Sequence, residues 1–516
     1  MKLDLLIRVL VTTAAAALLS KISAPANWHA VHWIAYLPFF WVLRAETPRE
    51  DRWYAFLYGT VAVGVIFAWV PHTISVFSNI PDLGARVLGL LFDMAFGLPY
   101  FAVFAAVHPL RKRLGDLWIV ALPAWLVIVE YTSMYVILFP YNQGVSQFGN
   151  PYTWQLASVT GVWGLSYLVL FVNCAFGEAL YRHREGRPMP LRWAASAVSV
   201  LSLVVIFGVQ RYNRIEAELR TAPTLTYQQI QVDTTMQHRM SSSRNKTLDD
   251  WLSESRKIPP GSVDLVVWSE GASPGNVHEG PIYDILSPLI AQGGYEMLVG
   301  GGTLTIHYDE QGKPLRTEAG KVDYEAYNSV YLFNREGKVA GRYDKTVPLP
   351  FGEYLPLSGV FPWLNDLIEG PGNFRAGPEV HDLQGATYAY ATPICYEAIL
   401  PSVCLRFPAP DLLVNVTNDA WFTGAATFQH GMLAAVRATE LGVPLLRAAY
   451  TGTSFVVEPH GVIYAQTPSF ERVNRPVTIR MAHFETFYAR FGDWFVLVCG
   501  LGLAGLAARY RLKAGA

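Results

Sequence analysis

The chain has 516 residues, a formal net charge of −1 at pH 7 and a charged fraction of only 16%. Soluble proteins typically have about 25% charged residues, so this composition predicts that much of the chain lies in lipid. A nearly neutral chain without a basic stripe gives no electrostatic reason to expect binding to nucleic acid. Because the apolar blocks are concentrated in the N-terminal part and in a short C-terminal stretch, we expect a membrane protein that carries one large soluble domain.

Eight apolar segments are candidates for transmembrane helices, because roughly 20 apolar residues are needed to cross about 30 Å of hydrocarbon. They span residues 5–23, 27–45, 53–74, 88–110, 117–136, 154–181, 191–212 and 491–510. The first could be a cleaved signal peptide, but Arg8 inside it and the apolar segments after it favour a retained helix. We therefore expect a seven-helix membrane domain over 1–215, a soluble domain over 220–485, and a C-terminal helix with its tail over 490–516.

The lysines and arginines between these segments predict the orientation of the bundle, because short cytoplasmic loops carry an excess of positive charge. Basic residues gather between segments two and three, four and five, and six and seven, and in the C-terminal tail. They are Arg44, Arg49, Arg52, Arg111, Lys112, Arg113, Arg182, Arg184, Arg187, Arg192, Arg509, Arg511 and Lys513. Both termini are therefore expected in the cytoplasm and the soluble domain on the opposite side, which in a bacterium is the periplasm beside the inner membrane.

Two acidic residues, Asp93 and Glu130, fall inside expected spans. An ionisable group at that depth is costly unless it faces protein or water. The pair could line a polar cavity or a lipid-headgroup site, or each could make an interhelical hydrogen bond that fixes packing. The sequence leaves both interpretations open.

The soluble domain alternates short β-branched and aromatic runs with helical stretches such as 281–292 and 427–442, which predicts a layered α/β domain. Polar residues stand where several expected strands end. Glu270 closes "DLVVWSE", Cys395 closes "YAYATPIC", and Asn418 follows "LLVNVT". Strand ends that lead into loops are where α/β folds usually place their chemistry.

Cys395 is one of only four cysteines, and a nucleophilic cysteine needs a base and donors for a developing oxyanion. Glu270 is the candidate base, Lys345 the candidate cation, and the backbone N–H of Tyr396 a second donor. Spacing alone also allows a solvated carboxylate, a surface ion pair and a disulfide from Cys395 to Cys404, nine residues on. No His and Cys set has metal-ligand spacing, and the "GGG" at 300–302 lacks the residues of a phosphate-binding loop.

Four stretches in order, "WSEGASP", "YDKTVPLPFGEYLP", "PICYE" and "NVTNDAWF", resemble the nitrilase superfamily and its Glu-Lys-Cys triad. With the expected helices, the whole chain resembles the apolipoprotein N-acyltransferase family. That resemblance implies an eight-helix membrane bundle joined to a nitrilase-like αββα sandwich. It also implies a catalytic triad and four supporting or substrate-binding residues. The triad is Glu270, Lys345 and Cys395, and the supporting residues are Asn328, Glu353, Tyr396 and Glu397.

The resemblance further implies acyl transfer without a cofactor or metal ion. The acyl donor would be a phospholipid, expected to be phosphatidylethanolamine attacked at its sn-1 ester, and the acyl chain would pass through a Cys395 thioester. The acceptor would be the α-amino group of the N-terminal S-diacylglyceryl cysteine of an apolipoprotein, as the last step of lipoprotein maturation. A single chain is expected to suffice. A membrane-tethered amidase or hydrolase that uses water, and a non-catalytic binding protein, remain alternatives.

Three positions depart from the family pattern, namely His238, Gly271 with its neighbour Ser269, and Tyr450. None belongs to the triad, so the departures bear on acyl-chain or donor preference. The apolar stretch after "FGEYLP" could be a lid that excludes water from the thioester or an ordinary packed loop. Its apolar residues are Phe361, Trp363, Leu364, Leu367 and Ile368.

Overall fold

The computed structural model describes most of the chain, with several gaps. The described residues are 2–43, 48–77, 80–136, 141–232, 244–316, 320, 322–350, 352–355, 360–361, 374–422 and 424–514. They form two compact units. A helical unit comprises Met1–Glu216, Thr439–Leu441 and Glu485–Ala516, and an α/β unit comprises Ala217–Ala438 and Gly442–Phe484.

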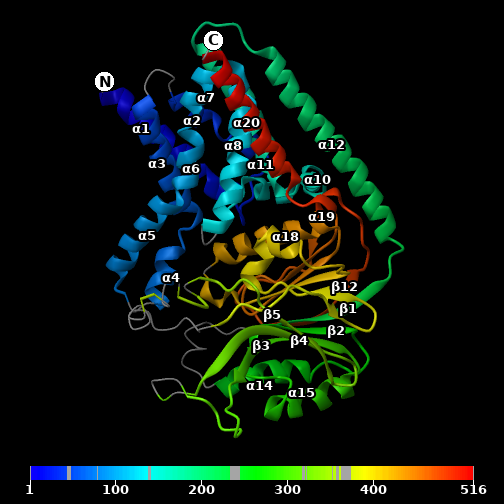
Figure 1. The fold of residues 1–516 in the computed structure, drawn as a ribbon. Helices are drawn as coiled ribbons and strands as arrows, with labels where there is room; N and C mark the ends of the chain where they lie inside the picture. The colour runs from blue at the N-terminus through cyan, green and yellow to red at the C-terminus, as the bar shows by residue number, and fades with distance from the viewer. Residues whose placement is uncertain are drawn as a thin grey trace. The chain divides into compact units, whose positions relative to one another are not determined.

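The helical unit consists of short and long helices. They are α1 (Lys2–Ile22), η1 (Val31–Trp33), α2 (Leu37–Val42), α3 (Pro48–Ile66), α4 (Val70–Phe77), α5 (Asp82–Phe96), α6 (Leu98–Phe104), α7 (Val107–Leu114), η2 (Gly115–Leu117), α8 (Trp118–Val136), η3 (Gln143–Gly149), α9 (Pro151–Trp154), α10 (Ala157–Thr160), α11 (Val162–Arg184), α12 (Leu191–Leu219), α19 (Phe487–Phe491) and α20 (Trp494–Ala514). Figure 1 follows them from blue to green and, for α19 and α20, in red.

Four helical stretches among the described residues are long and apolar enough to cross a membrane. They are Leu3–Ile22, Asp82–Val136, Val162–Arg184 and Leu191–Leu219, and the shorter apolar stretches are Val31–Val42 and Trp494–Tyr510. The expected spans 27–45, 53–74 and 88–110 are broken into shorter helices. Pro38, Pro71 and Pro99 stand in the first turns of the helices that follow the breaks. Proline lacks a backbone N–H and is favoured in the first turn of a helix, so a new helix often begins there. A hydropathy window does not detect such a start and joins the two helices into one segment.

The first helix is integrated into the helical unit. Arg8 of α1 is buried and its guanidinium lies 2.9 Å from Glu50 Oε2 of α3. The same side chain donates to the Val42 carbonyl at 2.9 Å and stacks over the Tyr54 ring. These contacts join α1 to α2 and α3, and the retention of this segment stays a prediction from the sequence.

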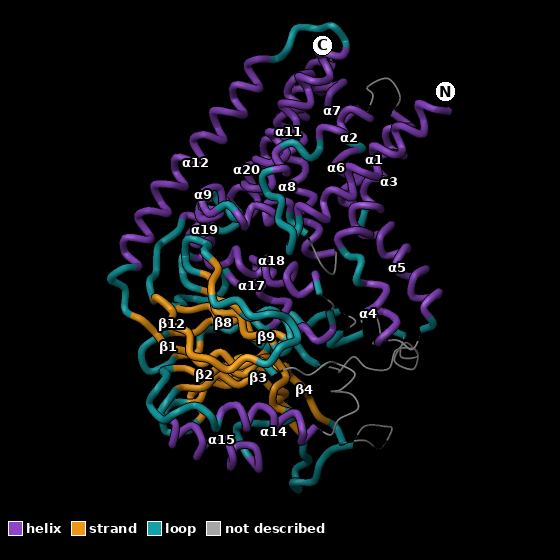
Figure 2. Tube along the Cα trace, turned by 180° about the vertical axis from the view of Figure 1, so that it is seen from behind, coloured by secondary structure: helices purple, strands orange, loops and turns teal. Residues whose placement is uncertain are grey.

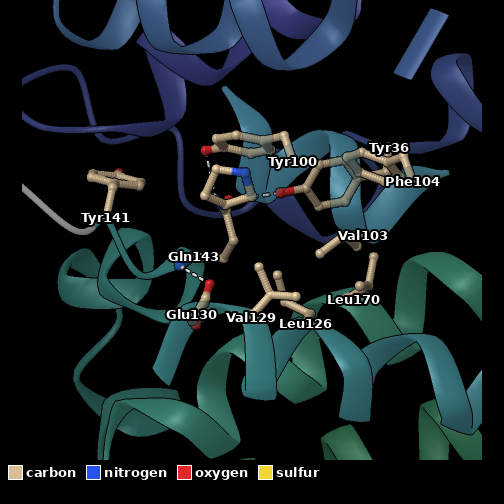
Figure 3. Close-up of a pocket in the computed structure, with 11 residues that line it drawn as sticks. Tyr36, Tyr100, Val103, Phe104, Leu126, Val129, Glu130, Tyr141, Gln143 and Leu170 are labelled. Carbon is tan, nitrogen blue, oxygen red and sulfur yellow. Dashed lines mark hydrogen bonds between the residues drawn. The ribbon is translucent and has the colours of Figure 1, made fainter. Parts of the chain in front are cut away.

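Glu130 of α8 belongs to a buried hydrogen-bonded group shown in Figure 3. Its Oε1 accepts from the Gln143 N–H at 2.8 Å, while the Gln143 side chain donates to Tyr100 and accepts from Tyr36. The adjoining cavity is about 30 Å³, which has room for water but not for a lipid headgroup. This geometry favours the packing interpretation of Glu130. Asp93 of α5 lies against Gly64 of α3, where an added Cβ would meet its carboxylate at 2.9 Å.

The α/β unit holds two six-stranded sheets within the described residues. Its elements are β1 (Thr224–Gln231), α14 (Arg244–Ser255), β2 (Leu265–Ser273), α15 (Gly280–Gly293), β3 (Glu296–Ile306), β4 (Tyr324–Phe333), β5 (Val339–Asp344), β6 (Leu383–Gln384), β7 (Ala389–Ala391), η4 (Cys395–Ile399), α17 (Pro401–Cys404), β8 (Leu412–Thr417), η5 (Asp419–Trp421), α18 (Ala425–Leu441), β9 (Leu445–Ala449), β10 (Phe455–Val457), β11 (Ile463–Tyr464) and β12 (Val473–Arg480). The strand orders are β12-β1-β2-β3-β4-β5 and β11-β10-β9-β8-β7-β6. Strands β1, β2 and β3 are parallel, as are β7, β8 and β9.

The two sheets face each other through β2, which contacts both β8 and β9. Helices α14 and α15 cover the outer face of the first sheet and α18 covers the second (Figures 1 and 2). Trp251 of α14, Trp268 of β2 and Ile290 of α15 are fully buried in one core. This is the expected αββα layering, because each sheet buries one face on its partner and the other under helices.

Candidate active site

Glu270 sits in a distortion of β2. The expectation that it ends the strand is wrong, because β2 continues to Ser273. Pairing with β3 loses its register between Trp268 and Ser273, and Gly271 has φ +64°. Glycine adopts that left-handed conformation without penalty, which explains why a larger residue is absent after Glu270. The Glu270 carboxylate therefore comes from a bulge within β2, a central strand of the first sheet.

The glycine run at 300–302 has a structural role beside this bulge. A Cβ on Gly300 would lie 2.3 Å from the Ser269 carbonyl oxygen and 2.9 Å from the Glu270 Cα. Strand β3 therefore approaches the Glu270 backbone more closely than any side chain would allow.

Lys345, which directly follows β5, lies between two carboxylates. Its Nζ is 2.7 Å from Glu353 Oε2 and 3.8 Å from Glu270 Oε1. The Asn328 amide of β4 donates to both carboxylates, at 2.7 Å to Glu270 and 2.5 Å to Glu353. All four residues are buried, so the structure brings the expected base and cation together with two expected supporting residues.

Backbone donors complete the orientation of both carboxylates. Glu270 Oε2 accepts from the Asn418 N–H at 2.7 Å, and Glu353 Oε2 accepts from the Leu349 N–H at 2.7 Å. Burial raises the pKa of the Glu270 carboxyl above its ordinary value, although the Lys345 charge opposes that rise. Burial alone would lower the pKa of Lys345, but the carboxylates of Glu353 and Glu270 raise it, so the ammonium stays charged.

Cys395 opens the turn η4 and does not end a strand, since β7 stops at Ala391. Its φ of +50° is rare for a residue with a side chain, and such strain is often held at functional sites. The thiol is buried, and no disulfide joins Cys395 to Cys404. Burial and the Glu270 charge raise the pKa of the Cys395 thiol, while Lys345 lowers it. Both Glu270 and Lys345 therefore lie close enough to Cys395 to influence the pKa of its thiol.

Glu397 does more than neighbour the cysteine. Its Oε1 accepts from the N–H groups of Thr346 and Val347 at 2.7 and 3.0 Å, directly after Lys345. Its Oε2 accepts from the Ile394 N–H at 2.9 Å, directly before Cys395. This fully buried carboxylate therefore ties the two catalytic candidates to each other. Tyr396 is also buried, with its ring inside the same unit.

A buried polar cluster behind Cys395 was largely missed by sequence reasoning. It consists of Asn415 and Thr417 of β8, Asp419 of η5, His430 of α18 and Arg447 of β9. The Arg447 guanidinium donates to Asp419 at 2.6 Å, and His430 Nδ1 lies 3.0 Å from the same carboxylate. Burial alone would raise the pKa of Asp419, but Arg447 and His430 lower it to about 2. The available signal was a charged residue inside the apolar run "PLLRAA".

Other residues that the sequence singled out either lie outside the described residues or have different surroundings. His238 and the lid candidates Trp363, Leu364, Leu367 and Ile368 lie outside the described residues. Phe361 is described and is 45% exposed. Tyr450 is fully buried, with its ring 5.6 Å from that of Trp251, so this departure belongs to the core of the α/β unit.

Comparison with known proteins covers both units. Residues 15–175 match the family model described as the apolipoprotein N-acyltransferase N-terminal domain, and residues 229–482 match that of the carbon–nitrogen hydrolases. An apolipoprotein N-acyltransferase of Pseudomonas syringae pv. tomato is 30% identical over 515 residues and 97% of each chain. One of Bradyrhizobium diazoefficiens is 30% identical over 94% of this chain and 92% of its own. A solved carbon–nitrogen hydrolase of Helicobacter pylori G27 aligns at 15% identity and TM-score 0.35, over 50% of this chain and 89% of that chain.

The match over residues 229–482 and the two facing six-stranded sheets of the described residues define a domain of the carbon–nitrogen hydrolase class. The two relatives align with this chain over both the helical region and this domain. The chain therefore belongs to the apolipoprotein N-acyltransferase family, which confirms the resemblance and makes it an acyltransferase. With its apolar helices, this membership indicates a protein of the bacterial inner membrane.

Proposed function

We propose that this enzyme transfers a fatty acyl chain from a phospholipid to the N-terminal S-diacylglyceryl cysteine of apolipoproteins, the last step of their maturation. The transfer passes through a thioester on Cys395, and phosphatidylethanolamine, attacked at sn-1, is the proposed donor. One observation carries the proposal. The buried Lys345 lies 3.8 Å from Glu270, and Glu397 ties the backbone beside Lys345 to the backbone beside Cys395, in a chain whose full-length relatives are named apolipoprotein N-acyltransferase.

In the first step, Glu270 takes the proton of the Cys395 thiol as the sulfur forms a bond to the ester carbonyl carbon. The carbonyl π electrons move to oxygen, where the Lys345 ammonium and the Tyr396 N–H stabilise the oxyanion. The oxyanion then re-forms the C=O bond and the C–O bond to glycerol breaks. Glu270 returns its proton to the departing oxygen, so a lysophospholipid leaves and a thioester remains.

In the second step, the α-amino group of the diacylglyceryl cysteine attacks the thioester carbon. The same oxyanion donors stabilise the new tetrahedral intermediate, and Glu270 takes a proton from the nitrogen. When the C–S bond breaks, the sulfur leaves as a thiolate and recovers that proton, and the product is an amide. The steps use protein groups alone and need no cofactor or metal ion.

The supporting residues have distinct proposed roles. Asn328 and Glu353 fix the position of Lys345 relative to Glu270. The Asn328 amide supports this role, because it donates to both carboxylates. Glu397 sets the relative position of Lys345 and Cys395 through its backbone contacts. These residues act through the triad, so their loss should lower the rate of the chemical steps more than the affinity for lipid.

We further propose the organisation that the charge pattern predicts. Residues 1–215 and 490–516 form eight membrane spans with both termini in the cytoplasm, and residues 220–485 act in the periplasm as part of a single sufficient chain. The breaks at Pro38, Pro71 and Pro99 are compatible with spans built from consecutive short helices, since neighbouring helices can satisfy the freed backbone groups.

An alkyne-tagged phosphatidylethanolamine tests the proposal. The wild-type enzyme should acquire an acyl adduct that hydroxylamine removes, and a Cys395→Ala variant should acquire none. A Cys404→Ala variant is the matched control, since Cys404 is also a buried cysteine outside any disulfide, and it should be labelled as the wild type is. Absence of any adduct on folded wild-type enzyme would contradict the proposal. Loss of the adduct to water at the same rate as to acceptor would favour the hydrolase alternative.

A further inference from the structure

Asn415 contacts the backbone on both sides of the nucleophile's turn. It lies in β8 and is fully buried. Its side-chain Nδ2 donates to the carbonyl oxygen of Pro393 at 2.9 Å and to that of Cys395 at 3.4 Å. A buried amide donor that faces two carbonyls is a specific arrangement, because each carbonyl would otherwise lose a hydrogen bond.

The orientation of this amide is fixed by Arg447. One guanidinium nitrogen of Arg447 donates to Asn415 Oδ1 at 2.5 Å, and another donates to Asp419 at 2.6 Å. Arginine has donors only, so the amide oxygen must face it and the amide NH₂ must face the two carbonyls. Arg447 and Asp419 are both fully buried, which makes this support rigid.

The contact with Cys395 determines where the next N–H points. The peptide bond between Cys395 and Tyr396 is trans, and in a planar trans peptide the C=O and N–H point in opposite directions. A carbonyl held toward Asn415 therefore directs the Tyr396 N–H to the other side of the turn. If the peptide rotated, a carbonyl oxygen would replace the donor and would repel an oxyanion.

We propose that Asn415, locked by Arg447, is a positioning residue that holds the Cys395–Tyr396 peptide in the orientation that offers the Tyr396 N–H to the oxyanion. This inference rests on the proposed acyl transfer. Because the φ of +50° at Cys395 is strained, we expect the Cys395–Tyr396 peptide to rotate when the hydrogen bond from Asn415 is lost. Asn415 thus acts on the transition state without touching the substrate.

Two reactions of the same thiol separate this role from a merely structural one. Acylation by a lipid ester passes through an oxyanion, whereas alkylation by iodoacetamide displaces iodide and forms no oxyanion. Both reactions need the thiol to be accessible and ionised. A defect confined to the peptide orientation should therefore slow acylation only.

The test uses Asn415→Asp, which keeps the shape and the acceptor for Arg447 but loses the donor. Acylation of Cys395 by alkyne-tagged phosphatidylethanolamine should fall by about 10²-fold, the usual effect of losing one oxyanion donor. Alkylation by iodoacetamide should remain at the wild-type rate. Asn415→Ala removes the same donor without adding a charge and should show the same split if the aspartate variant fails to fold.

Asn474→Asp is the matched control. Asn474 also donates to a carbonyl of the α/β unit, that of Glu254 at 3.0 Å, and its variant should keep both rates. Equal loss of acylation and alkylation in the Asn415 variants, or unchanged acylation, would overturn the inference. If the wild-type enzyme is alkylated but never acylated, the proposed function itself fails and the inference fails with it.

Discussion

At the scale of single residues, the proposed mechanism makes the reaction depend on the ionisation of Glu270. Glu270 must be deprotonated to accept the thiol proton, and burial raises its pKa above the ordinary value of 4.5. Acylation should therefore fall as the pH is lowered through that raised pKa, so the acid limb of the pH–rate profile lies above 4.5. Single-turnover acylation across pH measures this limb. A limb at the ordinary glutamate pKa would show that another group is the base.

A variant of Asn328 tests whether the acid limb of the profile reports the ionisation of Glu270. Its hydrogen bond to Glu270 favours the charged carboxylate and lowers the pKa. Removing the donor with Asn328→Leu should therefore raise the pKa of Glu270 further and move the acid limb to higher pH. An unmoved limb would mean that the profile does not report Glu270.

Lys345 combines a structural and a chemical role, which a pair of variants can separate. Lys345→Met leaves two buried carboxylates without their cation, and we expect a loss of about 3–5 kcal/mol in unfolding free energy, as when one partner of a buried ion pair is removed. Adding Glu353→Gln removes one surplus charge and should restore much of the thermal stability. Acylation should remain absent in both variants. Activity that returned together with stability would contradict an oxyanion role for Lys345.

At the scale of elements, Glu397 joins η4 to the loop after β5. Glu397→Ala removes the acceptor for Thr346, Val347 and Ile394. Hydrogen exchange should therefore accelerate in residues 344–347 and 394–399 together, while the parallel strands β1, β2 and β3 stay protected. Acceleration in one segment alone would show that Glu397 does not couple them.

The sequence allowed the site's members to be predicted better than their local geometry. The stretches that resemble the nitrilase superfamily pointed to Glu270, Lys345 and Cys395, and the structure places Lys345 3.8 Å from Glu270. The backbone around them could not be predicted, because the bulge at Glu270 and the left-handed φ of Cys395 depend on packing between strands. Arg447 was missed for the same reason, as its partners come from β8 and η5.

The expected membrane spans show a second limit of prediction from sequence, which concerns where the helices break. Hydropathy, which depends on composition alone, located part of the apolar helices: four helical stretches among the described residues are long and apolar enough to cross a membrane, and two more are shorter. It could not locate the helix breaks, because these follow from prolines whose effect is local and steric. The interpretation of the first segment as a retained helix rested on Arg8 and on the apolar segments that follow it, and it stays a prediction.

At the scale of the whole molecule, the proposed topology can be tested with reporters. A fluorescent protein fused after Ala516 should fluoresce, because it would fold in the cytoplasm. Protease added to spheroplasts should cleave within residues 220–485, and the same enzyme should leave the C-terminal fusion intact. A protected α/β unit, or a cleaved fusion, would reverse the orientation.

The central claim is that Cys395 carries an acyl group that an amine removes. Acylated enzyme can be isolated and chased with a diacylated lipopeptide, with the same lipopeptide blocked at its α-amino group, or with buffer alone, and the intact mass of the enzyme followed. The account predicts rapid loss of one acyl group only with the free amine, together with formation of a triacylated amide. Equal loss in all three chases, or an adduct that persists in Cys395→Ala, would contradict it.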